Sequence, residues 1–145
     1  MTTACLFCRI VAGDAPAFRV MEDASAVAFL DIKPLFPGHV LVVPREHHET
    51  LGDLPSAQVE SLFRVVRRLS VVVPATVGAD GSFVAANNRV SQSVPHLHVH
   101  VVPRRPRDGL RGFFWPRTRY ANDSEAAAIA QRLAIAYAEG DGFDT

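Results

Sequence analysis

The segment PHLHVHVVP at positions 95–103 alternates histidine with aliphatic residues between two prolines. In a β-strand successive side chains point to opposite faces, so the alternation predicts a strand with one histidine face and one core face. His96, His98 and His100 share the first face. A rise of about 3.3 Å per residue separates neighbouring histidines by about 7 Å, too far for all three to bind one ion readily. We therefore expect the three histidines to have different roles.

The rest of the chain predicts an α+β fold. Strands are expected as a pair within 18–34 around a polar turn at 22–24, then at 39–44 and 82–88. Apolar residues at three- and four-residue steps predict amphipathic helices over 55–73, ending before Pro74, and over 124–140. With the histidine strand these elements form a five-stranded antiparallel sheet with two helices, the first three strands in a meander.

The length and net charge of the chain limit the number of domains and the kinds of partner to expect. The 145 residues suit one domain over 1–145, with a core at about 4–104 and an arginine-rich, aromatic segment and helix at 105–140. Fifteen acidic residues balance fifteen basic ones, so no overall field attracts nucleic acid or an anionic membrane. No apolar run approaches the roughly 20 residues of a membrane span. We expect a cytoplasmic protein that binds neither nucleic acid nor membrane.

Six arginines lie at 104–119, around the aromatic residues Phe113, Phe114 and Trp115. Such interleaving can bind nucleic acid through phosphate contacts and stacking. A connector whose aromatic side chains cover the core or a dimer partner is the preferred interpretation.

Cys5 and Cys8 form a C-x-x-C pair. In a reducing compartment such a pair indicates half of a metal site or a redox motif rather than a structural disulfide. A redox motif is expected to follow a strand and to begin a helix, whereas only four residues precede Cys5. Metal binding is therefore the preferred interpretation.

The loop before the histidine strand is rich in amides and hydroxyls. Its polar residues are Asn87, Asn88, Ser91, Gln92 and Ser93. These groups suit phosphate or ribose oxygens, although an ordinary polar loop has the same composition. An imidazole beside such a loop can act as nucleophile, acid or base, hydrogen-bond donor or metal ligand.

The run SQSVPHLHVHVV resembles the signature of the histidine triad family of nucleotide hydrolases and transferases. CLFCRIVAG, the acidic turn MED and AFLDIKPLFPGHVLVVPREHH are similar in order and spacing to the Hint-like prokaryotic branch. The resemblance covers roughly residues 4 to 104. It implies a histidine triad fold with its sheet extended across a homodimer. It also implies hydrolysis at the α-phosphate of a purine nucleotide conjugate, such as a nucleoside 5′-phosphoramidate.

The resemblance assigns the catalytic residues. His98 is the implied nucleophile, giving a nucleotidyl-histidine that water resolves, and its second nitrogen should donate to a backbone carbonyl. His100 would bind phosphate oxygens, Ser93 would meet the leaving group, and Asp31 would accept ribose hydroxyls. The other implied nucleotide-binding residues are Phe7, Ile10, Phe29 and Ile32 around the base, with Asn87, Asn88, Gln92 and His39. Core packing is the alternative role for the apolar residues.

The same resemblance completes the metal site. It implies that Cys5, Cys8, His47 and His96 bind zinc, with His48 as a rival for His47. Two thiolates and two imidazoles close a tetrahedron, so the zinc would be structural rather than catalytic.

Three alternatives to this function remain open: a dinucleoside polyphosphate hydrolase, a zinc-stabilised nucleotide-binding or adaptor protein with marginal catalysis, and a redox protein. In one respect the sequence departs from the family. The stretch NNRVSQSV is shorter than the usual loop and lacks its glycines.

Overall fold

The structure is a computed structural model that describes residues 5–111 and 117–139. Contacts divide the chain into two compact units, Met1–Pro106 and Arg107–Thr145. The prediction of one domain over the whole chain stays a prediction. The aromatic residues Phe113, Phe114 and Trp115 lie outside the described residues.

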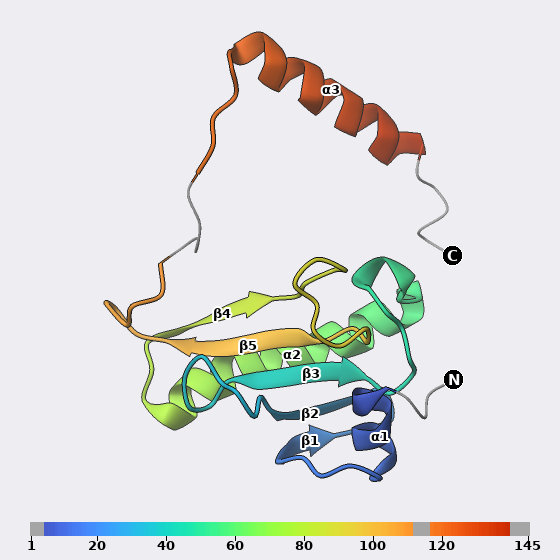
Figure 1. The fold of residues 1–145 in the computed structure, drawn as a ribbon, viewed down its shortest axis with the longest axis vertical. Coiled ribbons are helices and arrows are strands. Elements are labelled where there is room, and N and C mark those ends of the chain that lie inside the picture. The colour runs from blue at the N-terminus through green and yellow to red at the C-terminus, as the bar shows by residue number, and fades with distance from the viewer. Residues whose placement is uncertain (1–4, 112–116, 140–145) are drawn as a thin grey trace. The chain divides into compact units, whose positions relative to one another are not determined.

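The first unit is built on a five-stranded antiparallel sheet in the order β1-β2-β3-β5-β4 (Figure 1). The strands are β1 (Arg19–Glu22), β2 (Ala26–Leu30), β3 (Val40–Pro44), β4 (Gly81–Ala85) and β5 (Val99–Arg104). This confirms the predicted fold class and the meander of the first three strands. The Asp23 carboxylate accepts the backbone N–H groups of Ser25 and Ala26 and closes the turn between β1 and β2.

Two of the predicted strands are shorter than expected. β5 begins at Val99, because the N–H of Leu97 donates to the carbonyl of His48 at 2.7 Å instead of to a neighbouring strand. β4 ends at Ala85, and the following Asn88 accepts the N–H of Leu51 with its side chain at 2.9 Å. The residues just before β5 and just after β4 therefore lie in irregular segments, and both segments are hydrogen-bonded to residues 48–51.

The described residues form three α-helices and a short 3₁₀ turn. They are α1 (Leu6–Ala12), η2 (Leu51–Asp53), α2 (Ser56–Val77) and α3 (Asp123–Glu139). The sequence prediction missed α1, whose seven residues are too few for a clear helical period. It was also wrong that the first predicted helix ends before Pro74. A proline near the C-terminus removes only one helical hydrogen bond, and Gly78 at φ 69° completes the cap.

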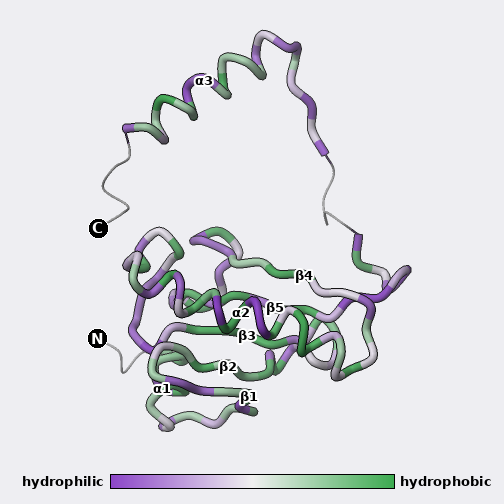
Figure 2. Tube along the Cα trace, turned by 180° about the vertical axis from the view of Figure 1, so that it is seen from behind, coloured by the Kyte–Doolittle hydropathy of each residue, from purple (hydrophilic) through white to green (hydrophobic). Residues whose placement is uncertain are grey.

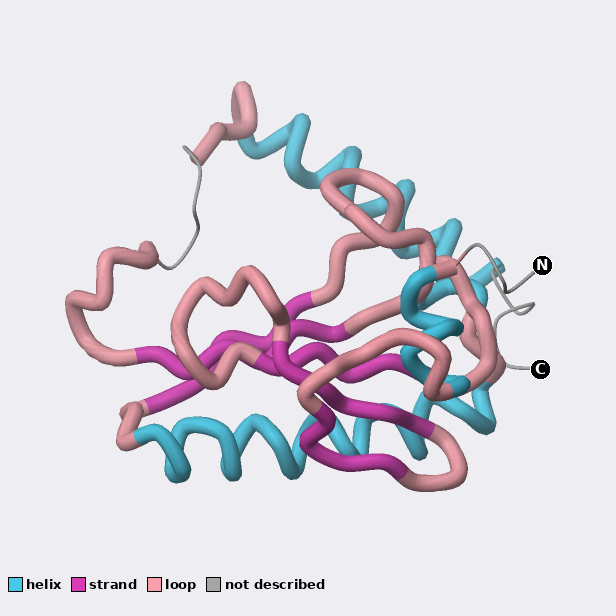
Figure 3. The backbone as a smooth tube through the Cα atoms, turned by 60° about the horizontal axis from the view of Figure 1, so that its bottom comes forward, coloured by secondary structure: helices cyan, strands magenta, loops and turns pink. Residues whose placement is uncertain are grey.

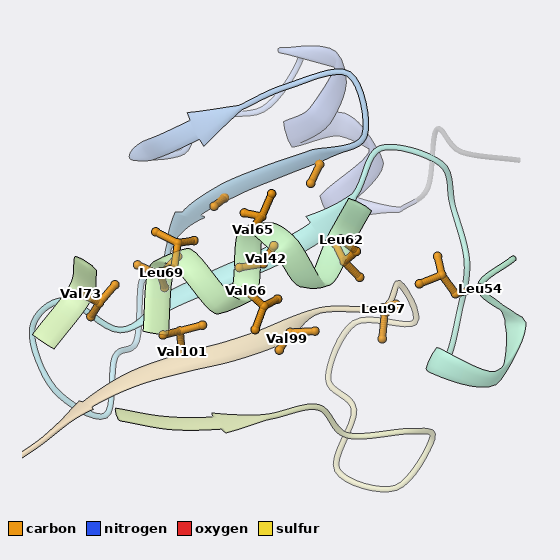
Figure 4. Packing of buried hydrophobic residues seen from close by; sticks show 13 residues of the cluster. Val42, Leu54, Leu62, Val65, Val66, Leu69, Val73, Leu97, Val99 and Val101 are labelled. Atoms are coloured by element: carbon orange, nitrogen blue, oxygen red, sulfur yellow. The ribbon is translucent and has the colours of Figure 1, made fainter. Parts of the chain in front are cut away.

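Helix α2 lies along one face of the sheet (Figure 3). Leu62, Val66 and Leu69 of the helix pack against Val42 and Val99 of the strands (Figure 4). Full burial of each such side chain contributes about 1.5–3 kcal/mol. Leu97, Val99 and Val101 all belong to this core, which confirms the predicted apolar face of the histidine segment.

The opposite face carries a second core cluster. Phe7 and Ile10 of α1 pack there with Phe29 of β2 and Leu41 of β3. Strands β2 and β3 are apolar on both faces and are drawn in green in Figure 2. His100 is paired with Leu41 across the β3–β5 ladder. The sheet thus separates helix α2 from helix α1 and the histidines.

In the second unit, α3 begins one residue before its predicted start, and no residue of the helix is buried. The side chain of Asn122 caps it by accepting the N–H of Glu125 at 2.9 Å. Among the described residues, no helix has the length and apolar character to span a bilayer.

Candidate active site

The first turn of α1 holds two thiols close together. Cys5 is the N-cap residue, and its sulfur accepts the N–H of Cys8 at 3.4 Å. Gly13 ends the helix in a left-handed conformation with φ 85°. Both cysteines are free and buried. Helix α1 therefore presents both sulfurs on the histidine face of the sheet.

The sulfurs of Cys5 and Cys8 and one ring nitrogen each of His47 and His96 all lie within 4.8 Å of one another. The Nδ1 atom of His96 is 3.5 Å from the Cys5 sulfur and 3.4 Å from the Cys8 sulfur. The Nδ1 atom of His47 is 3.3 Å from the Cys8 sulfur and 3.2 Å from Nδ1 of His96. Bonds of about 2.3 Å to sulfur and 2.0 Å to nitrogen give tetrahedral edges of about 3.5 Å and 3.3 Å. The four donors therefore fit one tetrahedral ion.

The protonation of this cluster follows from its neighbours. The Nε2–H of His96 donates to the carbonyl of Pro44 at 2.9 Å, so Nδ1 keeps its lone pair toward the thiols. Burial, with the charge of nearby histidines, lowers the pKa of His96 to about 4. Burial and the neighbouring Cys5 raise the pKa of the Cys8 thiol to about 11. A metal ion must displace this thiol proton in order to bind.

His48, the rival of His47, lies outside this cluster. Its Nε2 atom is 3.4 Å from a carboxylate oxygen of Glu46. Glu46 in turn accepts the side-chain N–H of Gln58 at 2.7 Å. His48 is thus directed toward helix α2 rather than toward the thiols.

His98 is held in one tautomer. Its Nδ1–H donates to the backbone carbonyl of His96 at 2.8 Å, in the form expected from the sequence. The lone pair of a neutral ring then resides on Nε2. His98 is only 4% exposed, and its ring lies nearly perpendicular to the Phe7 ring at a centroid distance of 5.1 Å. A fixed, unprotonated nitrogen is what a nucleophilic imidazole requires.

A chain of hydrogen bonds sets the proton of His100. The N–H of Leu35 donates to Nδ1 of His39 at 3.1 Å, so the proton of neutral His39 resides on Nε2. This Nε2 lies 2.9 Å from Nδ1 of His100 and 3.6 Å from a carboxylate oxygen of Asp31. His39 therefore donates to His100, whose own proton is left on Nε2. His100 is an N–H donor suited to an anion.

Asp31, His39 and His100 also offer three atoms within 4.8 Å of one another. Metal binding by His39 through Nε2 would require that nitrogen to lose its proton while Nδ1 still accepts from Leu35. The hydrogen-bond chain therefore explains this group better than a metal ion does.

We expect the free energy of unfolding to fall as the pH drops from about 6.5 to about 4. Burial, with the charges of His98 and His39, lowers the pKa of His100 to about 4. Between these values the unfolded chain binds more protons than the folded chain, so acid favours unfolding. Urea unfolding midpoints at pH 7, 5.5 and 4.5, measured with chelator present, provide the test. A His100→Asn protein should lose less stability over this range, and equal losses would contradict the prediction.

The structure separates the predicted base-binding residues into two groups. Phe7, Ile10 and Phe29 are 3–5% exposed and are core residues, which is the alternative that the sequence left open. Ile32 is 85% exposed in the loop after β2. A base-binding role for these four residues stays a prediction.

The predicted polar loop is also divided. Asn87, Asn88 and Ser93 are exposed. The side chain of Asn87 bonds within the loop, to the carbonyl of Ser91, whereas those of Asn88 and Gln92 bond to residues 49–51. Sequence reasoning missed the main-chain groups of Leu35 and Pro44 that orient the histidines. Every residue has such groups, so no sequence signal distinguishes them.

The family model of the HIT domain matches residues 12–107. The chain belongs to the HIT family. This confirms the resemblance drawn from the histidine strand and the N-terminal segment. The HIT family includes nucleotide hydrolases such as adenosine monophosphate phosphoramidases.

Relatives of this HIT protein match 77–97% of its length. An uncharacterized HIT-like protein of Mycobacterium tuberculosis is 36% identical over 97% of this chain and 99% of its own. The adenosine 5′-monophosphoramidase HNT1 of Candida albicans is 34% identical over 77% of this chain and 78% of its own. The crystal structure of a Zn-bound histidine triad family protein from Mycobacterium smegmatis is 37% identical, with a TM-score of 0.72 over 93% of this chain and 99% of that one.

Proposed function

We propose that this HIT protein hydrolyses a nucleoside 5′-phosphoramidate, or a related purine nucleotide conjugate, at the α-phosphate. The observation that carries the proposal is the 2.8 Å hydrogen bond from Nδ1 of His98 to the carbonyl of His96, which leaves Nε2 free to attack. Supporting it, a relative that is 34% identical is named an adenosine 5′-monophosphoramidase.

The reaction proceeds in two displacements at phosphorus. Nε2 of His98 forms a bond to the α-phosphorus while the phosphorus–nitrogen bond breaks, and the leaving nitrogen takes up a proton from solvent and departs as the amine. The Nε2–H of His100 donates to a phosphate oxygen, and the hydroxyl of Ser93 hydrogen-bonds the leaving amine. Water then attacks the phosphorus of the nucleotidyl-histidine and gives up a proton to solvent. The bond between phosphorus and Nε2 breaks, which releases the nucleoside monophosphate and returns His98 to its neutral form.

We assign Asp31 to the ribose hydroxyls. One carboxylate oxygen of Asp31 already accepts the N–H of Lys33 at 2.9 Å, which fixes the carboxylate at the end of β2. Asn87, Asn88, His39 and the exposed Ile32 complete the proposed nucleotide site.

We expect an Asp31→Asn protein to show a KM raised by about 10-fold with kcat changed by less than about threefold. Asparagine can still accept the N–H of Lys33, but it loses the charge that strengthens hydrogen bonds to ribose. Steady-state kinetics with adenosine 5′-phosphoramidate measure the effect. A fall in kcat at unchanged KM would contradict a ribose-binding role.

The Cys5, Cys8, His47 and His96 cluster is the proposed zinc site. Two thiolates and two imidazoles satisfy all four positions of a tetrahedral zinc ion, so the ion would be structural and would bind no substrate. The tetrahedral spacing of the donors and the Zn-bound relative from Mycobacterium smegmatis support this assignment.

The proposed assembly is a cytoplasmic homodimer that binds purine nucleotides and no nucleic acid. The sheet ends in two edge strands, β1 and β4, and an extended dimer sheet would pair one of them with its copy. A zinc site of this kind needs its two cysteines reduced, as they are kept in a reducing compartment.

The decisive experiment incubates the purified, metal-replete protein with adenosine 5′-phosphoramidate and measures the release of adenosine monophosphate. We expect turnover well above the uncatalysed rate. Release no faster than in buffer, in a protein that still binds adenosine monophosphate, would favour a binding or adaptor role. A parallel series with other leaving groups, including a dinucleoside polyphosphate, identifies the preferred conjugate.

A further inference from the structure

The loop between β4 and the histidine segment turns sharply without glycine. Arg89 has φ 70° and Ser91 has φ 59°, both in the left-handed region. Residues with a Cβ atom are unfavourable in this region, and the surrounding structure must hold them there. The contacts that hold this loop are therefore part of how the site is built.

Gln92 makes two of these contacts through opposite ends of its amide. Its carbonyl oxygen accepts the N–H of Arg89 at 2.7 Å, and its nitrogen donates to the carbonyl of Glu49 at 2.6 Å. The Arg89 guanidinium lies 3.7 Å from the Glu49 carboxylate, and Asn88 accepts the N–H of Leu51. The loop is thus tied to residues 49–51 by side chains.

Residues 47–51, here called the strap, are themselves fixed at several points. His47 lies in the metal cluster, and the carbonyl of His48 accepts the N–H of Leu97 at 2.7 Å. The N–H and hydroxyl of Thr50 donate to the carboxylate of Asp53 at 3.0 and 2.7 Å. The strap therefore offers Gln92 an anchor that is held independently of the loop.

We infer that Gln92 is a positioning residue, which ties the glycine-free loop to the strap and so sets the place of the adjoining Ser93. This inference rests on the proposed function, and it differs from the nucleotide contact that the family resemblance implies for Gln92. Both polar atoms of the Gln92 amide are already engaged with protein groups. Gln92 would then affect the reaction by holding the loop in place, and not by contacting the phosphate.

The test compares Gln92→Leu with the wild-type protein in three measurements. In substrate-free protein, hydrogen exchange of the Arg89 amide should accelerate at least about 10-fold, because its hydrogen-bond acceptor is removed. Affinity for adenosine monophosphate should stay within about threefold. The kcat for adenosine 5′-phosphoramidate should fall about 10- to 100-fold at nearly constant KM, because the leaving-group contact is misplaced.

Two further variants make the comparison specific. Gln131→Leu makes the same change on the exposed surface of α3 and should match the wild-type protein in all three measurements. Gln92→Glu keeps an acceptor for the Arg89 N–H and should restore protection of that amide, although it loses the donor to Glu49. Unchanged exchange in Gln92→Leu, or nucleotide affinity weakened 10-fold at constant kcat, would overturn the inference. The exchange and affinity measurements need no turnover, so they test Gln92 even if the proposed hydrolysis fails.

Discussion

The His98→Asn protein is expected to lose at least about 10³-fold in kcat for adenosine 5′-phosphoramidate. The asparagine amide can replace the Nδ1–H that donates to the carbonyl of His96, but it has no basic nitrogen to attack phosphorus. Removal of a nucleophile typically lowers rates by several orders of magnitude. Release of adenosine monophosphate measures the rate, and mass spectrometry of quenched reactions detects the nucleotidyl adduct in the wild-type protein only.

Two controls separate lost chemistry from lost structure. Affinity for adenosine monophosphate should stay within about threefold in His98→Asn, and His98→Ala should be equally inactive. His48→Asn makes the same change at a histidine that lies outside the metal cluster and pairs with Glu46, and it should retain turnover. A His98→Asn protein that turns over within 10-fold of wild type would exclude His98 as the nucleophile.

The Cys8→Ser protein is expected to lose bound zinc and to unfold at a temperature lower by about 10 °C. The Cys8 sulfur lies within 3.4 Å of Nδ1 in both His47 and His96, so its loss opens the tetrahedron. An ion present at about 1,000 times its dissociation constant stabilises a folded chain by about 4 kcal/mol, or roughly 8–16 °C for a protein of this size. Elemental analysis and thermal unfolding measure the two effects.

Chelation of the wild-type protein provides the matching control. It should lower the unfolding temperature to that of Cys8→Ser, and chelator should have no further effect on the variant. The proposed site would be disproved if the Cys8→Ser protein still bound one zinc ion per chain. It would also be disproved if chelator left the unfolding temperature of the wild-type protein unchanged.

The sheet was predictable because its strands follow simple periods. Alternation along 95–103 correctly placed Leu97, Val99 and Val101 in the core, and the turn residues between strands located the first three strands. The start of β5 was not predictable, because Leu97 bonds to the carbonyl of His48, which is distant in sequence.

Helix α1 shows why only half of the Cys/His cluster could be predicted from the sequence. Its C-x-x-C pair is a sequence signal, but a helix of seven residues has too few turns to reveal an apolar period. The geometry that joins Cys5 and Cys8 to His96 exists only after the strands have paired. Resemblance to a family supplied the missing histidines, and the four donors do lie together.

The tautomers of most of the histidines could not be predicted from the sequence. The N–H of Leu35 and the carbonyl of Pro44 determine them, and every chain position carries such groups. Only one bond could be anticipated, that from His98 to a backbone carbonyl, because the chemistry of an attacking imidazole requires it.

His96 serves the protein through two separate groups. Its imidazole faces the thiols, whereas its carbonyl, which belongs to the main chain, accepts the hydrogen bond from the Nδ1–H of His98. Any amino acid at position 96 supplies that carbonyl, so a point mutation there would remove one donor of the proposed zinc site without removing the acceptor that orients His98. During divergence, a descendant of this chain could therefore lose the proposed zinc site in one step and still keep the hydrogen bond that fixes the tautomer of His98.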